Sequence, residues 1–365
     1  MNSEFIQALR DLEREKGIDV DVLLEAIEAA LISAYKKNFN SLQNVRVDIQ
    51  RETGEIKVFT QRQVVEKVND SRLEISLEEA RKYNSNYEIG DIVEKEVTPR
   101  NFGRIAAQTA KQVVVQRIRE AERDLIYEEF ISRENDIVTG VIQRYEGKNV
   151  IIDIGKAEAV LVAGEQTPGE NYRQGERIKT YILEVRKTNK GPQIFVSRTH
   201  PGLIKRLFEL EVPEIHQGIV EIKAVAREAG ARSKIAVYSK EETVDPVGSC
   251  VGPKGSRVQA VVQELGGEKV DIIKWSSDPA VFIANSLSPS KVLDVVVDEE
   301  NKISQVIVPD DQLSLAIGKE GQNARLAARI TNWKIDIKSE SEAGDWYTWD
   351  DEVDITAFDG ELREE

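Results

Sequence analysis

Two short stretches of the sequence carry residues whose types and spacing suit phosphate binding. Residues 249–272 read SCVGPKGSRVQAVVQELGGEKVDI, and residues 314–337 read SLAIGKEGQNARLAARITNWKIDI. Each places two glycines and a lysine between apolar helical stretches, as Gly252-Pro253-Lys254-Gly255 and Gly318-Lys319-Glu320-Gly321. Glycine lets a phosphate backbone approach without a Cβ in the way, and N–H groups at the start of the next helix attract anions. Both loops are therefore predicted to clamp a phosphate backbone, with the lysine as an added cation.

The recurrence of this loop favours nucleic acid over an ordinary turn. A lone Gly-x-x-Gly is most often a helix cap, but here it occurs twice, 66 residues apart, each time between two helical stretches and before a strand. Apolar residues beside the loops are expected to wall a groove for bases: Val251, Val258, Ile317 and Ala324. This is the chemistry of the KH module, whose Gly-x-x-Gly loop clamps about four nucleotides of single-stranded RNA.

Polar residues on the helices that follow the loops are further candidates for RNA contact. They are Arg257, Asn323, Arg325 and Arg329. Arg257 and Arg325 lie within a turn or so of the loop, where a guanidinium can pair with phosphate. The alternative is that these side chains form an ordinary solvated helix face, and the sequence leaves both interpretations open.

The elements that must position the loops repeat in the same order. Over residues 200–276 and again over 277–340, the apolar patterns predict helix, strand, strand, helix, Gly-x-x-Gly, helix and strand. Two copies are too few for a solenoid. We therefore expect two tandem type II KH domains, each with helices packed on one face of a three-stranded sheet.

Residues 134–199 have a different pattern. Five short apolar strands punctuated by Gly, Pro and Asn predict a small closed barrel of the S1 or OB type. A purely structural barrel is the alternative. Candidate RNA contacts on it are Arg144, Tyr145, Lys148, Arg186 and Lys187. Few aromatic residues are available to stack on bases, so we expect a weaker, electrostatic contribution from the barrel.

Residues 1–133 are expected to form a separate head. Two amphipathic helices are followed by a hairpin that turns at residues 52–55, a short helix near Ser76 and a strand over residues 89–97. Residues from Arg100 onward contain no proline for more than thirty positions and predict a helix of roughly 45 Å at 1.5 Å per residue. Such a helix can connect two units.

Composition limits the possible functions. The chain has 365 residues and a net charge of −15, but residues 339–365 hold eleven acidic residues and one basic residue, so the body is nearly neutral and basic patches on it remain possible. One cysteine, Cys250, and two histidines are too few for a disulfide or a Cys/His zinc cluster. We expect no catalytic residues, no metal and no cofactor. No apolar run is long enough to span a bilayer and no secretory signal is present, which favours the cytoplasm.

The acidic segment over residues 341–365 is the last region of the chain. It holds four aromatic residues, Trp346, Tyr347, Trp349 and Phe358, among its acids. Such a composition cannot form a core by itself, and a disordered tail is the expectation. A peptide that docks on a basic surface, such as the KH face, is the alternative.

The whole order of parts resembles the NusA family of bacterial transcription factors. The resemblance rests on the multidomain α+β order of head, long helix, S1-type barrel and two KH domains, and on the helix sequence RNFGRIAAQ through RIREAER over residues 100–123. It implies binding to core RNA polymerase at the flap beside the RNA exit channel and to nascent single-stranded RNA. It also implies effects on pausing, intrinsic termination and antitermination, with other antitermination factors as further partners. Some members carry extra C-terminal acidic repeat domains, and the resemblance implies a short form without them.

Two other classes of function remain as alternatives. Some exoribonucleases carry KH and S1-type modules, but the head shows no cluster of carboxylates for catalysis and the barrel precedes the KH domains. A ribosome-associated RNA chaperone or an accessory protein in RNA processing also fits the sequence. We expect a monomeric, non-enzymatic regulator that does not bind membranes.

Overall fold

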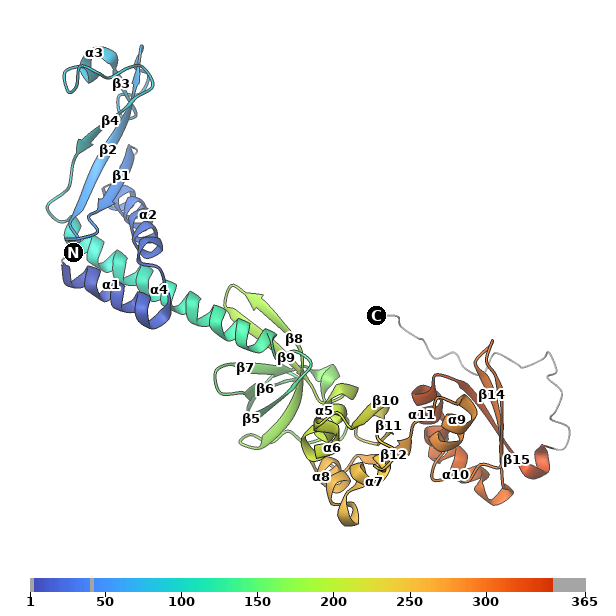
Figure 1. Cartoon of the computed structure of the whole chain (residues 1–365). Coiled ribbons are helices and arrows are strands. Elements are labelled where there is room, and N and C mark those ends of the chain that lie inside the picture. Colours follow the sequence, from blue (N-terminus) through green and yellow to red (C-terminus); the bar gives the residue numbers. More distant parts are fainter. Residues whose placement is uncertain (1–2, 40–42, 344–365) are drawn as a thin grey trace. The chain divides into compact units, whose positions relative to one another are not determined.

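The computed structural model describes residues 3–39 and 43–343, which form two compact units (Figure 1). The first unit contains residues up to 129 together with residues 187–192, and the second contains residues 130–186 and those from 193 onward. The acidic segment lies almost entirely outside the described residues, so the expectation that it is disordered stays untested. Residues 3–39 and 43–343 contain no helix with the length and hydropathy of a membrane span.

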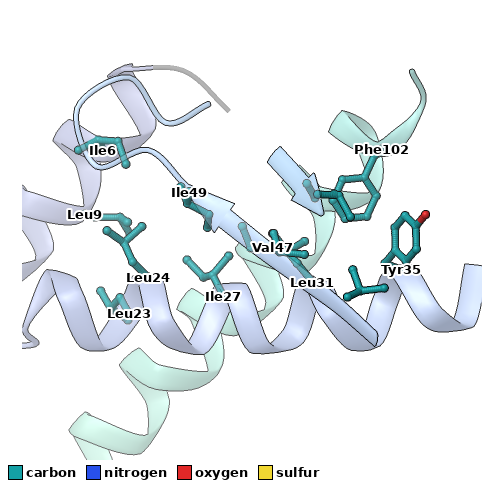
Figure 2. Close-up of a cluster of buried hydrophobic side chains, with 14 residues drawn as sticks. Ile6, Leu9, Leu23, Leu24, Ile27, Leu31, Tyr35, Val47, Ile49 and Phe102 are labelled. Atoms are coloured by element: carbon teal, nitrogen blue, oxygen red, sulfur yellow. The ribbon is translucent and has the colours of Figure 1, made fainter. Parts of the chain in front are cut away.

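The core of the first unit forms where three helices and a sheet meet. The helices are α1 (Ser3–Lys16), α2 (Val20–Phe39) and α4 (Phe102–Ile131), and β1 (Asn44–Ile49) lies along α2. Figure 2 shows side chains from all four elements in one cluster, with Ile27 and Leu31 of α2 fully buried beside Val47 of β1. The periodic apolar residues that predicted the two helices and the hairpin are the ones buried here.

A four-stranded sheet extends from this core. It is built from β1, β2 (Ile56–Val65), β3 (Glu74–Ser76) and β4 (Ile92–Glu96), with β2 pairing with each of the other three. The short helix α3 (Leu77–Ala80) begins after Ser76, whose side chain accepts a hydrogen bond from the Glu79 N–H. A second, smaller apolar cluster lies where β2, β3, β4 and α3 meet: Val64, Ile75, Ala80 and Val93.

The predicted long helix is confirmed as α4, which spans 30 residues. Its N-terminal part is anchored by Phe102, Ala106 and Ala110, all buried in the core of the first unit. Its side chains between residues 111 and 129 are exposed or only half-buried. Helix α4 is thus packed into the core of the first unit at its N-terminal end and partly exposed along its middle, and Phe130 near its C-terminal end is buried again.

The predicted barrel is also confirmed. Its strands are β5 (Ile137–Glu146), β6 (Asn149–Asp153), β7 (Glu158–Leu161), β8 (Arg177–Thr188) and β9 (Gly191–Ser197). They close in the order β5-β6-β7-β9-β8, and a short 3₁₀ turn, η1 (Ala163–Glu165), follows β7. Alternation of apolar side chains fills the interior, for example Ile142 and Val150, as expected for a small barrel.

The predicted repeat is confirmed in its order and sheet topology. The first KH domain contains α5 (Pro201–Glu211), α6 (Pro213–His216), β10 (Val220–Glu228), β11 (Arg232–Ser239), α7 (Pro246–Val251), α8 (Ser256–Glu264) and β12 (Lys269–Lys274). The second contains α9 (Pro279–Ser286), β13 (Asp294–Asp298), β14 (Ile303–Val308), α10 (Leu313–Ile317), α11 (Gln322–Thr331) and β15 (Lys334–Ser339), with 3₁₀ turns η3 (Asp310–Gln312) and η5 (Glu340–Glu342). In each sheet the second strand is central, antiparallel to the first and parallel to the third.

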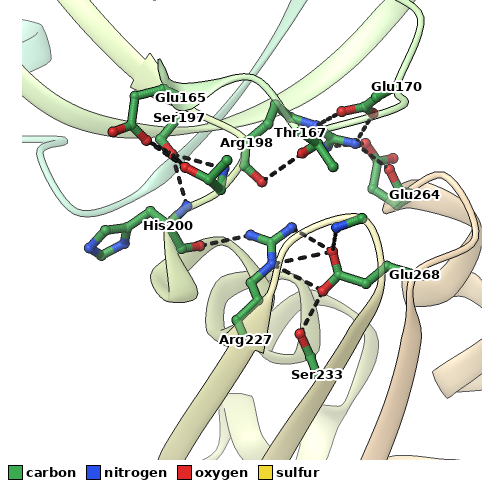
Figure 3. Close-up of polar contacts among 12 residues, drawn as sticks. Glu165, Thr167, Glu170, Ser197, Arg198, His200, Arg227, Ser233, Glu264 and Glu268 are labelled. Carbon is green, nitrogen blue, oxygen red and sulfur yellow. Dashed lines mark hydrogen bonds and ion pairs between the residues drawn. The ribbon is translucent and has the colours of Figure 1, made fainter. Parts of the chain in front are cut away.

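Buried ion pairs join the barrel to the first KH domain (Figure 3). The Arg198 side chain, 1% exposed, donates to the Glu170 carboxylate on the barrel and to the Glu264 carbonyl at the end of α8. Lys179 of β8 also pairs with the Glu264 carboxylate at 2.9 Å. Desolvated charges are tolerated only when they are fully paired, and this requirement fixes the geometry of the junction.

A second buried pair lies inside the first KH domain. Arg227 and Glu268 have side chains 1% and 0% exposed, and the Arg227 Nη2 to Glu268 Oε2 distance is 3.0 Å. Glu268 also accepts from the Ser233 hydroxyl and the Gly230 N–H, while Arg227 donates to the His200 carbonyl. The last contact reaches the segment that leaves the barrel, so this network also restrains the junction.

The two KH domains contact each other through different faces. The outer face of the first sheet, carrying Ala226, Ala236 and Ile273, packs against Phe282 of α9 and Leu326 and Ile330 of α11. At the edge of this apolar contact, the fully buried Lys234 Nζ donates to Asp271 at 3.1 Å and to the Ser288 carbonyl at 2.8 Å. The domains therefore form a continuous packed assembly.

Candidate nucleic-acid interface

The two Gly-x-x-Gly loops have the same backbone conformation. The first glycine has φ/ψ of 74°/173° at Gly252 and 78°/173° at Gly318, and the second has 77°/14° at Gly255 and 72°/12° at Gly321. The third residue is left-handed in both, with φ of 53° at Lys254 and 54° at Glu320. These loops, η2 (Pro253–Gly255) and η4 (Lys319–Gly321) with their preceding glycines, are therefore two copies of one local structure.

The first glycine of each loop is required by the packing of the chain itself. A Cβ on Gly252 would lie 2.6 Å from Cγ of Arg257, and one on Gly318 would lie 2.9 Å from the backbone nitrogen of Asn323. The backbone here also occupies a region that is essentially limited to glycine. This glycine lets the loop fold tightly against the following helix.

The second glycine of each loop has open space beside it. A Cβ added at this position would have its nearest neighbour 4.0 Å away, an atom of Val258 at Gly255 and the end of the Arg325 side chain at Gly321. In both loops the second glycine is also the N-cap of the next helix, and no side chain caps α8 or α11 among the described contacts. By contrast, α7 and α9 are capped by aspartates. The Ser256 and Gln322 N–H groups donate to the Pro253 and Lys319 carbonyls, and no described side chain accepts from the N–H groups that follow them, so each helix N-terminus stays open to an external anion.

The family comparisons match every part of this arrangement. The NusA N-terminal domain matches residues 4–124, the S1 RNA binding domain residues 132–197, the NusA-like first KH domain residues 198–275 and the NusA-like second KH domain residues 279–345. The chain is 65% identical to the transcription termination/antitermination protein NusA of Halalkalibacterium halodurans over 353 residues, which are 97% of this chain and 92% of that one. The chain belongs to the NusA family.

Other relatives agree with this assignment. NusA of Bacillus subtilis is 66% identical over 343 residues, covering 94% of this chain and 92% of that protein, and NusA of Thermus thermophilus is 45% identical over 356 residues, covering 94% and 92%. The solution structure of the N-terminal domain of NusA from B. subtilis is 65% identical and covers 34% of this chain and 99% of that one, with a TM-score of 0.31.

The two lysines of the NusA loops occupy different positions. Aligning the glycines places Lys254 at the third position, where the second loop has Glu320, and Lys319 at the second position, where the first loop has Pro253. Both lysines are exposed, and in the described part of the chain neither takes part in an ion pair. The first loop therefore presents one uncompensated cation, whereas the second presents a cation beside a carboxylate.

Arg257 and Asn323 are equivalent residues that hold the loops from behind. The Arg257 Nη1 donates to the Ser249 carbonyl at 2.6 Å and to Glu214 at 2.9 Å. The Asn323 Nδ2 donates to the Ala316 carbonyl at 3.0 Å and, more weakly, to that of Leu315. Asn323 is 3% exposed, which counts against the direct RNA contact predicted for it. Its side chain supports the end of α10 instead.

The other two candidate arginines lie on the exposed side of α11. Arg325 Nε donates to Glu228 Oε1 at 2.6 Å, and Arg329 lies 3.8 Å from the same oxygen. The side chains of these arginines are 42% and 56% exposed. Hydrogen bonding from Arg325 lowers the pKa of Glu228. Sequence reasoning missed this residue of the first KH domain, which neutralises part of the cationic face of the second.

Apolar side chains beside the loops differ between the copies. Leu315 and Ile317 in the second copy are 44% and 39% exposed. Val251 in the first copy is less exposed, because it is half-buried. Val258 and Ala324, on the helices that follow, are also half-buried. An exposed apolar pair next to a loop predicted to bind phosphate is suited to a base of the same nucleotide chain.

Two of the barrel residues predicted to contact RNA, Arg144 and Arg186, form ion pairs with neighbouring carboxylates. Arg144 pairs with Glu146 at 2.7 Å and Glu158 at 2.8 Å, and hydrogen bonding to these acids raises the pKa of Arg144. Arg186 pairs with Glu184 at 2.6 Å and stacks over the Phe195 ring at 4.9 Å.

The remaining barrel candidates differ from one another. Lys187 belongs to the first compact unit and pairs with Asp124 of α4 at 2.6 Å. Tyr145 is 54% exposed, and Lys148 is exposed without a described ion pair. Of the five, these two are the most available, which fits a minor electrostatic role for the barrel.

Proposed function

We propose that this chain acts in transcription termination and antitermination by holding nascent single-stranded RNA on its two KH loops while its N-terminal unit contacts RNA polymerase near the RNA exit channel. The duplicated loop carries the RNA part of this proposal, because two loops of the same backbone conformation precede helix N-termini that no side chain caps. The names of the relatives support a role in transcription termination and antitermination, since each is a transcription termination/antitermination protein. Modulation of pausing follows if the factor restrains emerging transcript.

The proposed RNA contacts comprise both loops, together with Arg257, Arg325 and Arg329 as neighbouring cations and Tyr145 and Lys148 on the barrel. Each KH loop clamps a few nucleotides, and each contact is individually weak. Binding to polymerase would raise the effective concentration of RNA at the loops, so weak contacts suffice.

The N-terminal unit is better suited to a protein partner. Its sequence holds no Gly-x-x-Gly, and near the smaller apolar cluster along the chain it exposes Tyr83, Ile89 and Ile92, at 59%, 53% and 53%. Apolar side chains that gather into one exposed patch are typical of surfaces that bind other proteins. We therefore assign the polymerase contact to residues 1–133.

Charge reversal in the loops tests the RNA assignment. Lys254→Asp and Lys319→Asp together place carboxylates where phosphate is proposed to lie. The double variant is expected to keep its circular dichroism spectrum and lose most of its affinity for a single-stranded RNA, measured by fluorescence anisotropy. Lys82→Asp, an exposed lysine of the head, is the matched control and should bind normally. Unchanged affinity in the double variant would refute the clamp.

A truncation tests the division of labour. Residues 1–133 are expected to retain core polymerase in a pull-down without RNA, and residues 134–365 are expected to bind RNA but not polymerase. Retention of polymerase by 134–365 alone would overturn the assignment.

We also infer that the chain is a monomeric, non-enzymatic protein of the cytoplasm. The relatives are named as transcription factors and lend no support to a ribosome-associated chaperone or an RNA-processing protein. Incubation with end-labelled RNA should leave the RNA intact. Co-purification with ribosomes in place of polymerase would instead favour the chaperone.

A further inference from the structure

The outer face of the first KH sheet is only partly covered by the second KH domain. The covered part is lined by small or apolar residues that pack under α9 and α11. Beyond it, at the end of β11 and after β12, lie two aromatic residues, Tyr238 and Trp275. This end of the sheet is separate from the Gly-x-x-Gly loop, which joins the helices on the opposite face.

Tyr238 and Trp275 form an aromatic pair with a lysine beside it. Their ring centroids are 5.5 Å apart at an interplanar angle of 83°. The Lys223 Nζ lies 5.3 Å from the Tyr238 centroid and 5.7 Å from that of Trp275. Lys223 thus lies over one face of the Tyr238 ring, and a stacked base would occupy the part of the ring that neither Lys223 nor Trp275 covers.

Packing accounts for Trp275 but not for Tyr238. Trp275 is half-buried and contacts Phe282 of α9, so it closes the interface between the KH domains. Tyr238 is 37% exposed and does not belong to the buried cluster. Within the described part of the chain its hydroxyl has no hydrogen-bond partner. The tyrosine ring is therefore an exposed surface whose presence the fold does not require.

The charges around the ring suit an anion. The Glu221 carboxylate lies between two lysines, 2.5 Å from Lys223 Nζ and 2.7 Å from Lys240 Nζ. Lys240 has a side chain 56% exposed. Two cations share one carboxylate here, so these three groups together carry one positive charge beside the ring, although the exposed Glu241 and Glu242 follow Lys240 along the chain. A phosphate can compete with Glu221 for either lysine.

We propose that Tyr238, supported by Trp275, is a stacking platform for a base of single-stranded RNA, and that Lys223 and Lys240 bind the adjoining phosphates. Sheet-borne aromatic residues flanked by cations stack bases in other RNA-binding folds. A protein partner fits less well, because lysine is depleted in the cores of protein interfaces. The platform rests on the proposed function, since it extends the RNA path of a chain that binds RNA on its KH loops.

The experiment uses the full chain and a 30-nucleotide single-stranded RNA containing 4-thiouridine. Ultraviolet crosslinking followed by peptide mapping should place a crosslink on the peptide containing Tyr238. Tyr238→Ala should weaken binding about tenfold, which corresponds to about 1.4 kcal/mol, and should remove this crosslink. Tyr238→Phe keeps the ring and should bind like the unaltered chain. Glu221→Gln frees both lysines and should tighten binding.

The outcomes separate failure of the platform from failure of the proposed function. If Tyr238→Ala binds normally and no crosslink forms there, while Lys254→Asp/Lys319→Asp abolishes binding, the platform is wrong and the KH clamp stands. If no variant changes RNA affinity, both fail. If Tyr238→Ala leaves RNA affinity intact but weakens retention of purified core polymerase, the ring is a protein contact and the proposal is overturned.

Discussion

Substituting the two glycines of the first loop one at a time separates folding from binding. In Gly252→Ala the new Cβ would lie 2.6 Å from Arg257 Cγ and 2.9 Å from its Cδ, in a backbone conformation that is essentially limited to glycine. The conformational strain alone costs about 1–3 kcal/mol, and displacing Arg257 disturbs its bonds to Ser249 and Glu214. We expect a loss of about 3 kcal/mol in unfolding free energy.

Gly255→Ala is expected to behave differently. Its Cβ would have no atom nearer than 4.0 Å, and the left-handed backbone costs about 1 kcal/mol for an alanine. The methyl group would, however, stand on the side from which a phosphate is proposed to approach the start of α8. This variant should remain nearly as stable as the unaltered chain and bind single-stranded RNA several-fold more weakly.

Two measurements on each variant check this contrast. Peptide-level hydrogen exchange over α7 and α8 reports local stability, and fluorescence anisotropy with a short RNA reports affinity. Gly318→Ala and Gly321→Ala provide an independent replicate, because Gly318 faces the backbone nitrogen of Asn323 whereas Gly321 faces only the end of Arg325. Equal destabilisation by both members of a pair, with no change in RNA affinity, would refute the division of roles between the two glycines.

Three further predictions follow from other parts of the chain. Deleting residues 344–365, which hold nine acidic residues and one basic residue, should leave RNA affinity equal or tighter, because this charge repels RNA within about 10 Å at 0.1 M salt; a several-fold loss in anisotropy titrations would contradict this. Glu268→Gln should leave the buried Arg227 charge uncompensated and cost about 3–5 kcal/mol in urea unfolding, whereas the exposed Glu241→Gln should cost almost nothing; equal effects would refute the role of burial. The pKa of Glu228 lies below its usual value of 4.5 because Arg325 donates to it, so the stability it adds is present above pH 4.5 and is lost as the pH falls through the lowered pKa. Denaturation between pH 3 and 6 should show this loss in the unaltered chain but not in Glu228→Gln, and parallel curves would contradict it.

The sequence was sufficient for the order of the elements and for the loops. Periodic apolar residues and turn residues predict the helices of the head, α4, the barrel strands and the two copies of the repeat. These signals depend only on residues that are close together in the sequence. The different lysine positions in the two loops could also be predicted from the sequence, because aligning the glycines of the two copies pairs Lys319 with Pro253. That alignment needs no structural information.

Contacts between segments that are distant in the sequence could not be predicted from the sequence. Asparagine is usually found on protein surfaces. Asn323 is buried because Leu287 and the end of α10 meet at its side chain. Glu228 neutralises Arg325 because two domains pack at one particular angle. Arg198 and Arg227 each follow an apolar strand segment, but nothing in the local sequence shows that these charged side chains are almost completely buried. Each depends on a partner more than 25 residues away.

The contact between the KH domains has a consequence for the direction of a bound strand. The first domain contributes the outer face of its sheet and the second contributes α9 and α11, so unlike surfaces meet and no twofold axis relates the copies. RNA is itself directional, from its 5′ end to its 3′ end. A symmetric pair of clamps would present opposite polarities and force a continuous strand to turn back. An asymmetric pair carries no such requirement, so the RNA path proposed above can run from one loop to the other without reversing direction.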